Sequence, residues 1–189
     1  APKHPLGLYL NALILTKKQD YANAQAVLQR AGAALDDYLP AQYLRGAIAY
    51  AQGNLEQAAA NLNRFVAAVP DNANGRRLLG STMIRQGRFD DAVKTLQPLA
   101  DGQNADAASL SLVATARMGA GDYDMAIELF QKASSLDPKN SLYRTQLAVA
   151  RLAAGQNAEA VKDLQTAVKE DPEATRPQLL LVRYHLFNR

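Results

Sequence analysis

Apolar residues recur along this chain three and four positions apart, which is the spacing of amphipathic helices. The segment "SLYRTQLAVARLAA" (141–154) has this spacing, and so does the segment that follows the next glycine. Between such segments lie short breaks of two kinds. One is a glycine, or Gln19 in the first case, followed by a polar residue; the other contains Pro70, Pro138 or Pro172, or a loop-compatible Asp36 or Asn104. The pattern predicts a series of helices joined by short turns.

This pattern repeats with a fixed period of 34 residues. The phrases "QDYANAQAVL", "GNLEQAAANL", "GRFDDAVKTL", "GDYDMAIELF" and "GQNAEAVKDL" begin at Gln19, Gly53, Gly87, Gly121 and Gly155. An alanine recurs at Ala24, Ala58, Ala92, Ala126 and Ala160, and a small residue at Ala12, Gly46, Gly80, Ala114 and Ala148. Five copies in one register, without insertion or deletion, indicate a repeat architecture.

Each repeat is predicted to be a pair of antiparallel helices. The glycine takes the left-handed conformation that ends the first helix. The polar residue after it is expected to cap the second helix. The small residues let the two backbones approach closely, and Asp-Pro ends the pair.

These features resemble the tetratricopeptide repeat (TPR). The fourth copy carries the family pattern at Gly121, Tyr123, Ala126, Phe130, Ala133 and Pro138, whereas the first departs from it at Gln19. The resemblance implies an all-α fold, a right-handed superhelical α-solenoid of antiparallel helix pairs. The predicted organisation is an N-terminal flank (1–4), five repeats (5–38, 39–72, 73–106, 107–140 and 141–174) and the first helix of a truncated sixth (175–189).

The last predicted helix, "RPQLLLVRYHLF", is strongly apolar. Without a following helix it would expose Leu180, Leu181, Leu186 or Phe187. We therefore expect further repeats in a longer parent protein, and self-association through this exposed C-terminal helix.

Composition excludes several functional classes. The chain has 189 residues, no cysteine and a net charge of +3, so disulfides and cysteine-based sites are absent and a nucleic-acid surface is not predicted. No apolar run approaches the ~18 residues that span a bilayer. The chain begins Ala-Pro-Lys, without an initiator Met or a signal peptide, and is expected to be an excised piece.

No catalytic or metal-binding set emerges from the residues. The two histidines, His4 and His185, lie at opposite ends of the chain, and Ser81, Ser109 and Ser111 have no histidine nearby. Adjacent acidic residues lie at helix starts or turns, where capping explains them. The sequence therefore predicts a protein that is not an enzyme and that needs no cofactor or metal.

The TPR resemblance implies that the first helix of each repeat lines a concave groove. Its inward positions would include Tyr9, Tyr43, Arg77, Ser111 and Thr145, then Leu13, Ala47, Ser81, Thr115 and Val149, and one turn later Tyr50 and Arg85. The groove-binding candidates are Tyr9, Tyr43, Tyr50, Arg77, Ser81, Arg85 and Thr115. Tyrosine offers amphipathic contact area and arginine a planar fork for carboxylates, which suits a protein or peptide ligand with apolar and acidic groups. The alternative is that the tyrosines only pack between helices and the arginines are solvated.

One TPR subgroup clamps the C-terminal carboxylate of chaperones with Lys and Asn at inward positions. Tyr9, Leu13, Tyr43 and Ala47 occupy those positions here. The clamp is therefore predicted to be absent.

Several longer phrases, among them "DYLPAQYLRGAIAYAQGNLEQAAANLNRFVAAVPDN" and "GRRLLGSTMIRQGRFDDAVKTLQPLA", resemble the TPR lipoprotein of the bacterial PEP-CTERM/exosortase system. That resemblance implies a periplasmic or cell-envelope protein, attached to the membrane only through a lipid anchor outside these residues. It also implies a role in envelope protein export or exopolysaccharide assembly. The predicted function is a scaffold for protein–protein interaction; the alternatives are direct binding of acidic polysaccharide along the groove and a purely architectural, self-associating array.

Overall fold

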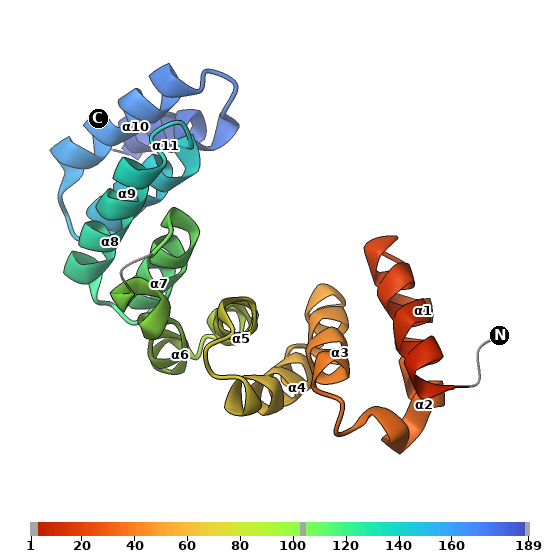
Figure 1. The fold of residues 1–189 in the computed structure, drawn as a ribbon. Helices are drawn as coiled ribbons and strands as arrows, with labels where there is room; N and C mark the ends of the chain where they lie inside the picture. Colours follow the sequence, from red (N-terminus) through yellow and green to blue (C-terminus); the bar gives the residue numbers. More distant parts are fainter. Residues whose placement is uncertain (1–3, 103–104, 188–189) are drawn as a thin grey trace. The chain divides into compact units, whose positions relative to one another are not determined.

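The computed structural model describes residues 4–102 and 105–187, which are entirely helical apart from the turns (Figure 1). The α-helices of this described part are α1 (Pro5–Lys17), α2 (Tyr21–Ala31), α3 (Leu39–Ala51), α4 (Leu55–Ala68), α5 (Ala73–Arg85), α6 (Phe89–Asp101), α7 (Ala107–Gly119), α8 (Tyr123–Leu136), α9 (Ser141–Ala153), α10 (Asn157–Glu170) and α11 (Thr175–Phe187). A short 3₁₀ helix, Gly32–Leu35, follows α2. The all-α prediction is confirmed. Among the described helices, none combines the length and apolar character that crossing a bilayer requires.

The helices form two compact units. The N-terminal unit, Ala1–Arg88, contains α1 to α5, and the C-terminal unit, Phe89–Arg189, contains α6 to α11. Within the N-terminal unit α1 packs on α2, α3 on α4, and α4 on α5; within the C-terminal unit each helix packs on the next. The boundary between the units lies inside the predicted third repeat, so α5 and α6 belong to different units.

The turn between the paired helices has the predicted left-handed backbone. Its φ values are +80°, +74°, +84° and +77° at Gly53, Gly87, Gly121 and Gly155. Gln19 adopts the same conformation with φ of +61°, although it has a Cβ. The turn geometry of the repeat therefore persists even where the glycine is missing.

Helix capping follows the prediction only in part. Asp20 accepts a hydrogen bond from the Asn23 backbone N–H, as expected. The equivalent residues Asn54, Asp122 and Gln156 make no such cap, so the prediction is wrong there. At Asp122 the reason is visible, because its carboxylate instead accepts a hydrogen bond from Arg117. The caps that the sequence analysis missed precede the first helix of three repeats, at Asn72, Asp106 and Asn140.

The predicted columns of small residues lie between the paired helices. Ala24, Ala58, Ala92, Ala126 and Ala160 are all fully buried. A Cβ added to Gly46 on α3 would lie 2.6 Å from Cγ of Leu62 on α4. The close approach of the two backbones therefore depends on the missing side chain, as predicted.

Helix α11 exposes a different face from the one expected. Leu186 and Phe187 are exposed as predicted, but Leu180 and Leu181 are partly buried against Ala148, Ala160 and Leu164. The exposed face consists instead of Leu179, Val182, Leu186 and Phe187. The prediction is wrong for Leu180 and Leu181 because those two side chains face the preceding helix pair.

Candidate functional site

Six of the seven predicted groove residues lie in the N-terminal unit. Tyr9 is on α1, Tyr43 and Tyr50 are on α3, and Arg77, Ser81 and Arg85 are on α5. Arg85 is exposed and the other five are half-buried. These six residues of α1, α3 and α5 are called the tyrosine–arginine face below.

The Tyr9 ring packs edge-on against Tyr38, with ring centroids 5.1 Å apart and planes at 88°. Burial raises the pKa of the Tyr9 hydroxyl above its ordinary value, and the neighbouring Tyr38 adds to the effect. At neutral pH the hydroxyl is a hydrogen-bond donor and acceptor rather than a charge. The half-buried Tyr9 ring thus has a packing contact with the residue that precedes α3.

Tyr43 is held in a similar way by Phe65 of α4, at a centroid separation of 5.2 Å. Phe65 itself fills the space beside α5, where a Cβ on Gly75 would lie 2.7 Å from its ring. The Tyr43 ring is therefore fixed by a contact that connects α3, α4 and α5. Such a ring is pre-positioned, which lowers the entropy cost of using it for binding.

Tyr50 and Arg85 are brought together. The Arg85 guanidinium lies over the Tyr50 ring, 4.7 Å from the centroid, and its Nη1 donates a hydrogen bond of 3.0 Å to the Tyr50 carbonyl. This cation–π contact and hydrogen bond hold the long arginine side chain in one orientation. Because the side chain is exposed, the remaining donors of the guanidinium face solvent, where they can bind a carboxylate.

Arg77, Ser81 and Arg85 lie four residues apart on α5, so they form one row along a helix face. Arg77 Nη1 is 3.4 Å from Oδ1 of Asn74, one turn earlier. The row places two guanidinium groups on the same side as Tyr50. The arrangement combines hydrogen-bond donors with aromatic surface.

Thr115, the seventh predicted groove residue, lies on α7 of the C-terminal unit. Its hydroxyl donates to the Ser111 carbonyl at 2.8 Å within α7. Ser111 and Thr145, predicted to line the groove, are buried. Ser111 donates to Oε1 of Gln146 and Thr145 to the Ser141 carbonyl. The prediction is wrong for these two residues because both are buried, with the Ser111 hydroxyl bonded to α9 and the Thr145 hydroxyl bonded within its own helix.

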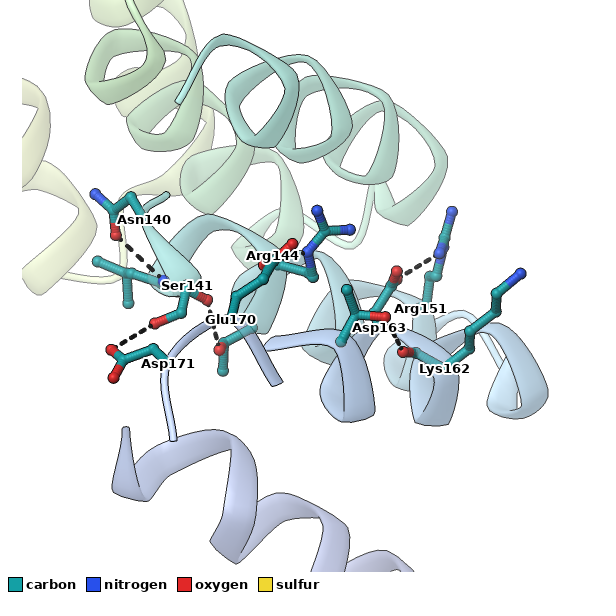
Figure 2. A network of polar contacts seen from close by, with 11 residues as sticks. Asn140, Ser141, Arg144, Arg151, Lys162, Asp163, Glu170 and Asp171 are labelled. Atoms are coloured by element: carbon teal, nitrogen blue, oxygen red, sulfur yellow. Dashed lines mark hydrogen bonds and ion pairs between the residues drawn. The ribbon is translucent and has the colours of Figure 1, made fainter. Parts of the chain in front are cut away.

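The C-terminal unit also contains a polar network that the sequence analysis missed (Figure 2). Arg151 on α9 pairs with Asp163 on α10, and Arg144 pairs with Glu170 at 2.8 Å. Burial raises the pKa of the Asp163 carboxyl, while Arg151 pulls it in the opposite direction. Figure 2 shows these pairs in a row along the two helices, so the network joins α9 to α10 and has a structural role.

No metal site is found in residues 4–102 and 105–187, where no three His, Cys, Asp or Glu side chains are grouped closely enough to hold an ion. The candidate site is the tyrosine–arginine face of α1, α3 and α5. Arg85 and Tyr50 are its best-defined pair.

Models of the family described as tetratricopeptide repeat match residues 49–115 and 117–184, and another such model matches 9–73. No curated protein matches the sequence. Among solved structures, MamA 41-end from Desulfovibrio magneticus RS-1 is similar with a TM-score of 0.82 at 18% identity, covering 93% of this chain and 99% of that one. YrrB, described as a TPR protein with an unusual peptide-binding site, has a TM-score of 0.79 at 17% identity and covers 94% and 92%. A thermophilic TPR protein of Thermus thermophilus has a TM-score of 0.70 at 18% identity and covers 97% and 100%.

Proposed function

The chain belongs to the tetratricopeptide repeat family, and we propose on that premise that it is a non-catalytic scaffold that binds a protein or peptide segment. The binding surface is the tyrosine–arginine face of the N-terminal unit. The observation that carries the proposal is the Arg85–Tyr50 pair, an exposed guanidinium held over an aromatic ring.

The chemistry of the face defines the class of ligand. Arg77 and Arg85 supply donors for carboxylates, and Tyr9, Tyr43 and Tyr50 supply amphipathic contact area. Arginine and tyrosine are enriched among the residues that dominate binding energy at interfaces. The ligand is therefore a segment that carries acidic side chains next to apolar ones. YrrB, by its description a peptide-binding protein, supports this choice at the level of fold.

The test is a titration of the 189-residue chain with a fluorescent peptide in which Asp or Glu alternates with Leu or Phe. We expect binding that Arg77→Ala plus Arg85→Ala weakens at least tenfold, the equivalent of ~1.4 kcal/mol. Arg64→Ala on α4, which removes an exposed arginine outside the face, is the matched control and should change little. Equal losses in both variants would show non-specific charge attraction, and no binding at all would remove the proposal.

An acidic polysaccharide could use the same arginines, because uronate carboxylates also pair with guanidinium groups. The packing of Tyr9 against Tyr38 and of Tyr43 against Phe65 favours the peptide, since part of each ring is already used. A parallel titration with alginate separates the two ligand classes. Binding of alginate but not of the peptide, lost in the same double variant, would replace the first proposal by the second.

We also propose, from the resemblance to the PEP-CTERM/exosortase TPR lipoprotein, that the parent acts in envelope protein export or exopolysaccharide assembly and is lipid-anchored in the cell envelope. The support is the set of longer phrases in the sequence. A full-length gene product with a lipidation cysteine, recovered in the membrane fraction and encoded beside an exosortase gene, is the expected result. A full-length product without such a cysteine would overturn it.

A further inference from the structure

The N-terminal unit contains a cavity of about 200 Å³ between α2, α3 and α4. None of the described residues that line it belongs to the tyrosine–arginine face. Its walls are rich in carboxamide side chains, which are Gln25 and Gln29 on α2, Gln52 at the end of α3, and Gln57 and Asn61 on α4. A carboxamide carries two hydrogen-bond donors and an acceptor but no charge. The cavity is therefore suited to a neutral ligand that forms hydrogen bonds.

The other repeats show that the fold does not require a polar residue at one of these positions. Positions 34 residues apart are equivalent, so Gln25 has four counterparts in the chain. All of them are apolar: Ala59, Val93, Ile127 and Val161. A polar residue at a position that the repeat otherwise fills with apolar side chains indicates a functional role.

The walls of the cavity combine apolar and polar surface. Leu28, Ile48 and Ala49 are buried, whereas the carboxamides are half-buried or exposed. The ligand must therefore present an apolar face together with groups that donate and accept hydrogen bonds. A sugar ring has this character, because C–H groups cover its face and each hydroxyl at its edge both donates and accepts. The volume is below the ~300–1,000 Å³ of pockets for drug-sized ligands, so it suits a single ring.

The charge of Arg45, which also lines the cavity, is already neutralised. Its Nη1 lies 2.6 Å from Oδ1 of Asp36, and its Nη2 donates to the Gly32 carbonyl at 3.1 Å. Among the described residues that line the cavity, no other is charged. An anion would find no free counter-charge to offset its loss of hydration, which favours a neutral sugar over an acidic one.

One acceptor in the cavity wall lacks a donor. Oε1 of Gln52 is buried and accepts no hydrogen bond within the part of the chain that the structure describes. Buried polar atoms in proteins are nearly always satisfied, by another protein group or by a bound molecule. The Gln52 oxygen is therefore a candidate acceptor for a hydroxyl of the ligand.

We propose that the cavity between α2, α3 and α4 binds one neutral hexose ring. The hydroxyls of the ring exchange hydrogen bonds with Gln25, Gln52 and Asn61, and its C–H face packs on Leu28 and Ile48. The ring is either a free monosaccharide or one unit of a neutral glycan, because the two share this chemistry. The site is independent of the tyrosine–arginine face, so either proposal can fail without the other.

NMR spectroscopy of the ¹⁵N-labelled 189-residue chain tests the proposal. Glucose, galactose and mannose are titrated separately, and we expect at least one of them to shift the side-chain amide signals of Gln25, Gln52 and Asn61. Gln25→Val plus Asn61→Leu introduces the residues that the third and fourth repeats carry at these positions and should weaken binding at least tenfold. The matched control, Asn63→Leu plus Gln165→Val, removes two exposed carboxamides outside the cavity and should leave binding unchanged. Circular dichroism of each variant checks that the helices still form.

A Gln52→Ala variant separates a binding role from a packing role. The fourth and fifth repeats carry alanine at this position, as Ala120 and Ala154, and the change removes the unbonded acceptor. We expect the ligand-free variant to unfold at the same temperature as the wild type or higher, while sugar binding weakens about fivefold through the lost hydrogen bond. A lower unfolding temperature with unchanged sugar binding would contradict the assignment of this acceptor.

Further ligands decide the source of the ring and its class. A trisaccharide of the sugar that binds, such as maltotriose for glucose, should bind at least as well if the ring is a glycan unit and should not bind if it is a free monosaccharide. Absence of shifts with all three sugars would overturn the proposal, and so would equal losses in the cavity variant and the control. Glucuronate binding as tightly as glucose would show that the site does not select a neutral ring. Binding of N-methylacetamide but of no sugar would assign the cavity to a peptide amide instead.

Discussion

The guanidinium of Arg85 lies over the ring of Tyr50, 4.7 Å from its centroid, and donates to the Tyr50 carbonyl. The two residues come from the first helices of successive repeats and are 35 positions apart in the chain. Each was predicted to face a groove, but only the folded chain shows that they contact each other. The pair has a stabilising role as well as the proposed binding role, and the two can be measured separately.

Replacing Arg85 with Ala should lower the free energy of unfolding of the N-terminal unit by about 1 kcal/mol, because an exposed cation–π contact is worth roughly 0.5–1 kcal/mol and a hydrogen bond is lost with it. Urea unfolding followed by circular dichroism measures the change. Tyr50→Phe keeps both the ring and the carbonyl and should be neutral. A loss in Tyr50→Phe as large as in Arg85→Ala would contradict the assigned contact.

Gly46→Ala should destabilise the chain by about 1–2 kcal/mol. The new Cβ would lie 2.6 Å from Cγ of the fully buried Leu62, and overpacking of this kind costs roughly 1–3 kcal/mol, partly offset by the higher helix propensity of Ala. Gly102→Ala is the control, because its Cβ would meet only a backbone oxygen at 3.7 Å. Thermal unfolding of the two variants should show a clear drop for the first only.

Gln19→Gly should stabilise the chain by about 0.5–1 kcal/mol. Gln19 has φ of +61° in the turn where the other repeats carry glycine. A left-handed conformation costs a residue with a Cβ roughly 1–2 kcal/mol. Glycine removes this strain, but its greater flexibility in the unfolded chain cancels part of the gain. The same change at Gln29, an exposed position inside α2, should destabilise by about 1 kcal/mol. Equal signs for the two variants would show that the turn conformation is not the cause.

Arg151→Ala should lower the free energy of unfolding by more than Arg144→Ala does. The first change leaves the buried Asp163 carboxylate without its partner and should cost about 2–3 kcal/mol at pH 7. The second removes a pair with Glu170, which is more accessible to solvent, and should cost less than about 1 kcal/mol. Denaturant unfolding gives both values, and similar losses would show that burial of Asp163 is not important.

The stability contributed by Asp163 should depend on pH in a defined direction. Its pKa is raised by burial in the folded chain above the ordinary 3.8, so the folded state binds the proton more tightly than the unfolded state does. The contribution is therefore complete below pH 3.8 and is lost as the pH rises through the folded pKa. The free energy of unfolding of the wild type minus that of Asp163→Asn should fall over this range, and a rise would show that the Arg151 charge outweighs burial.

The elements of this fold follow from local signals in the sequence. The 34-residue register placed the glycine turns correctly, because a helix must stop where the backbone turns left-handed and glycine adopts that conformation at least cost. The same register identified the buried alanine columns, since a small side chain at a fixed position in a helical pair always faces its partner.

Other features depend on which side chains meet across helices, and the repeat alone does not encode this. Ser111 and Thr145 share a column with Tyr9 and Tyr43 but are buried, whereas the two tyrosines are half-buried. The Arg151–Asp163 pair forms between two positions whose residues vary from repeat to repeat. The 34-residue pattern thus determined where the helices end, through backbone conformation, and how they pair within a repeat, through side-chain size. The assembled units decided which surfaces are buried, charged or open, because burial depends on residues that are distant along the chain and close in space.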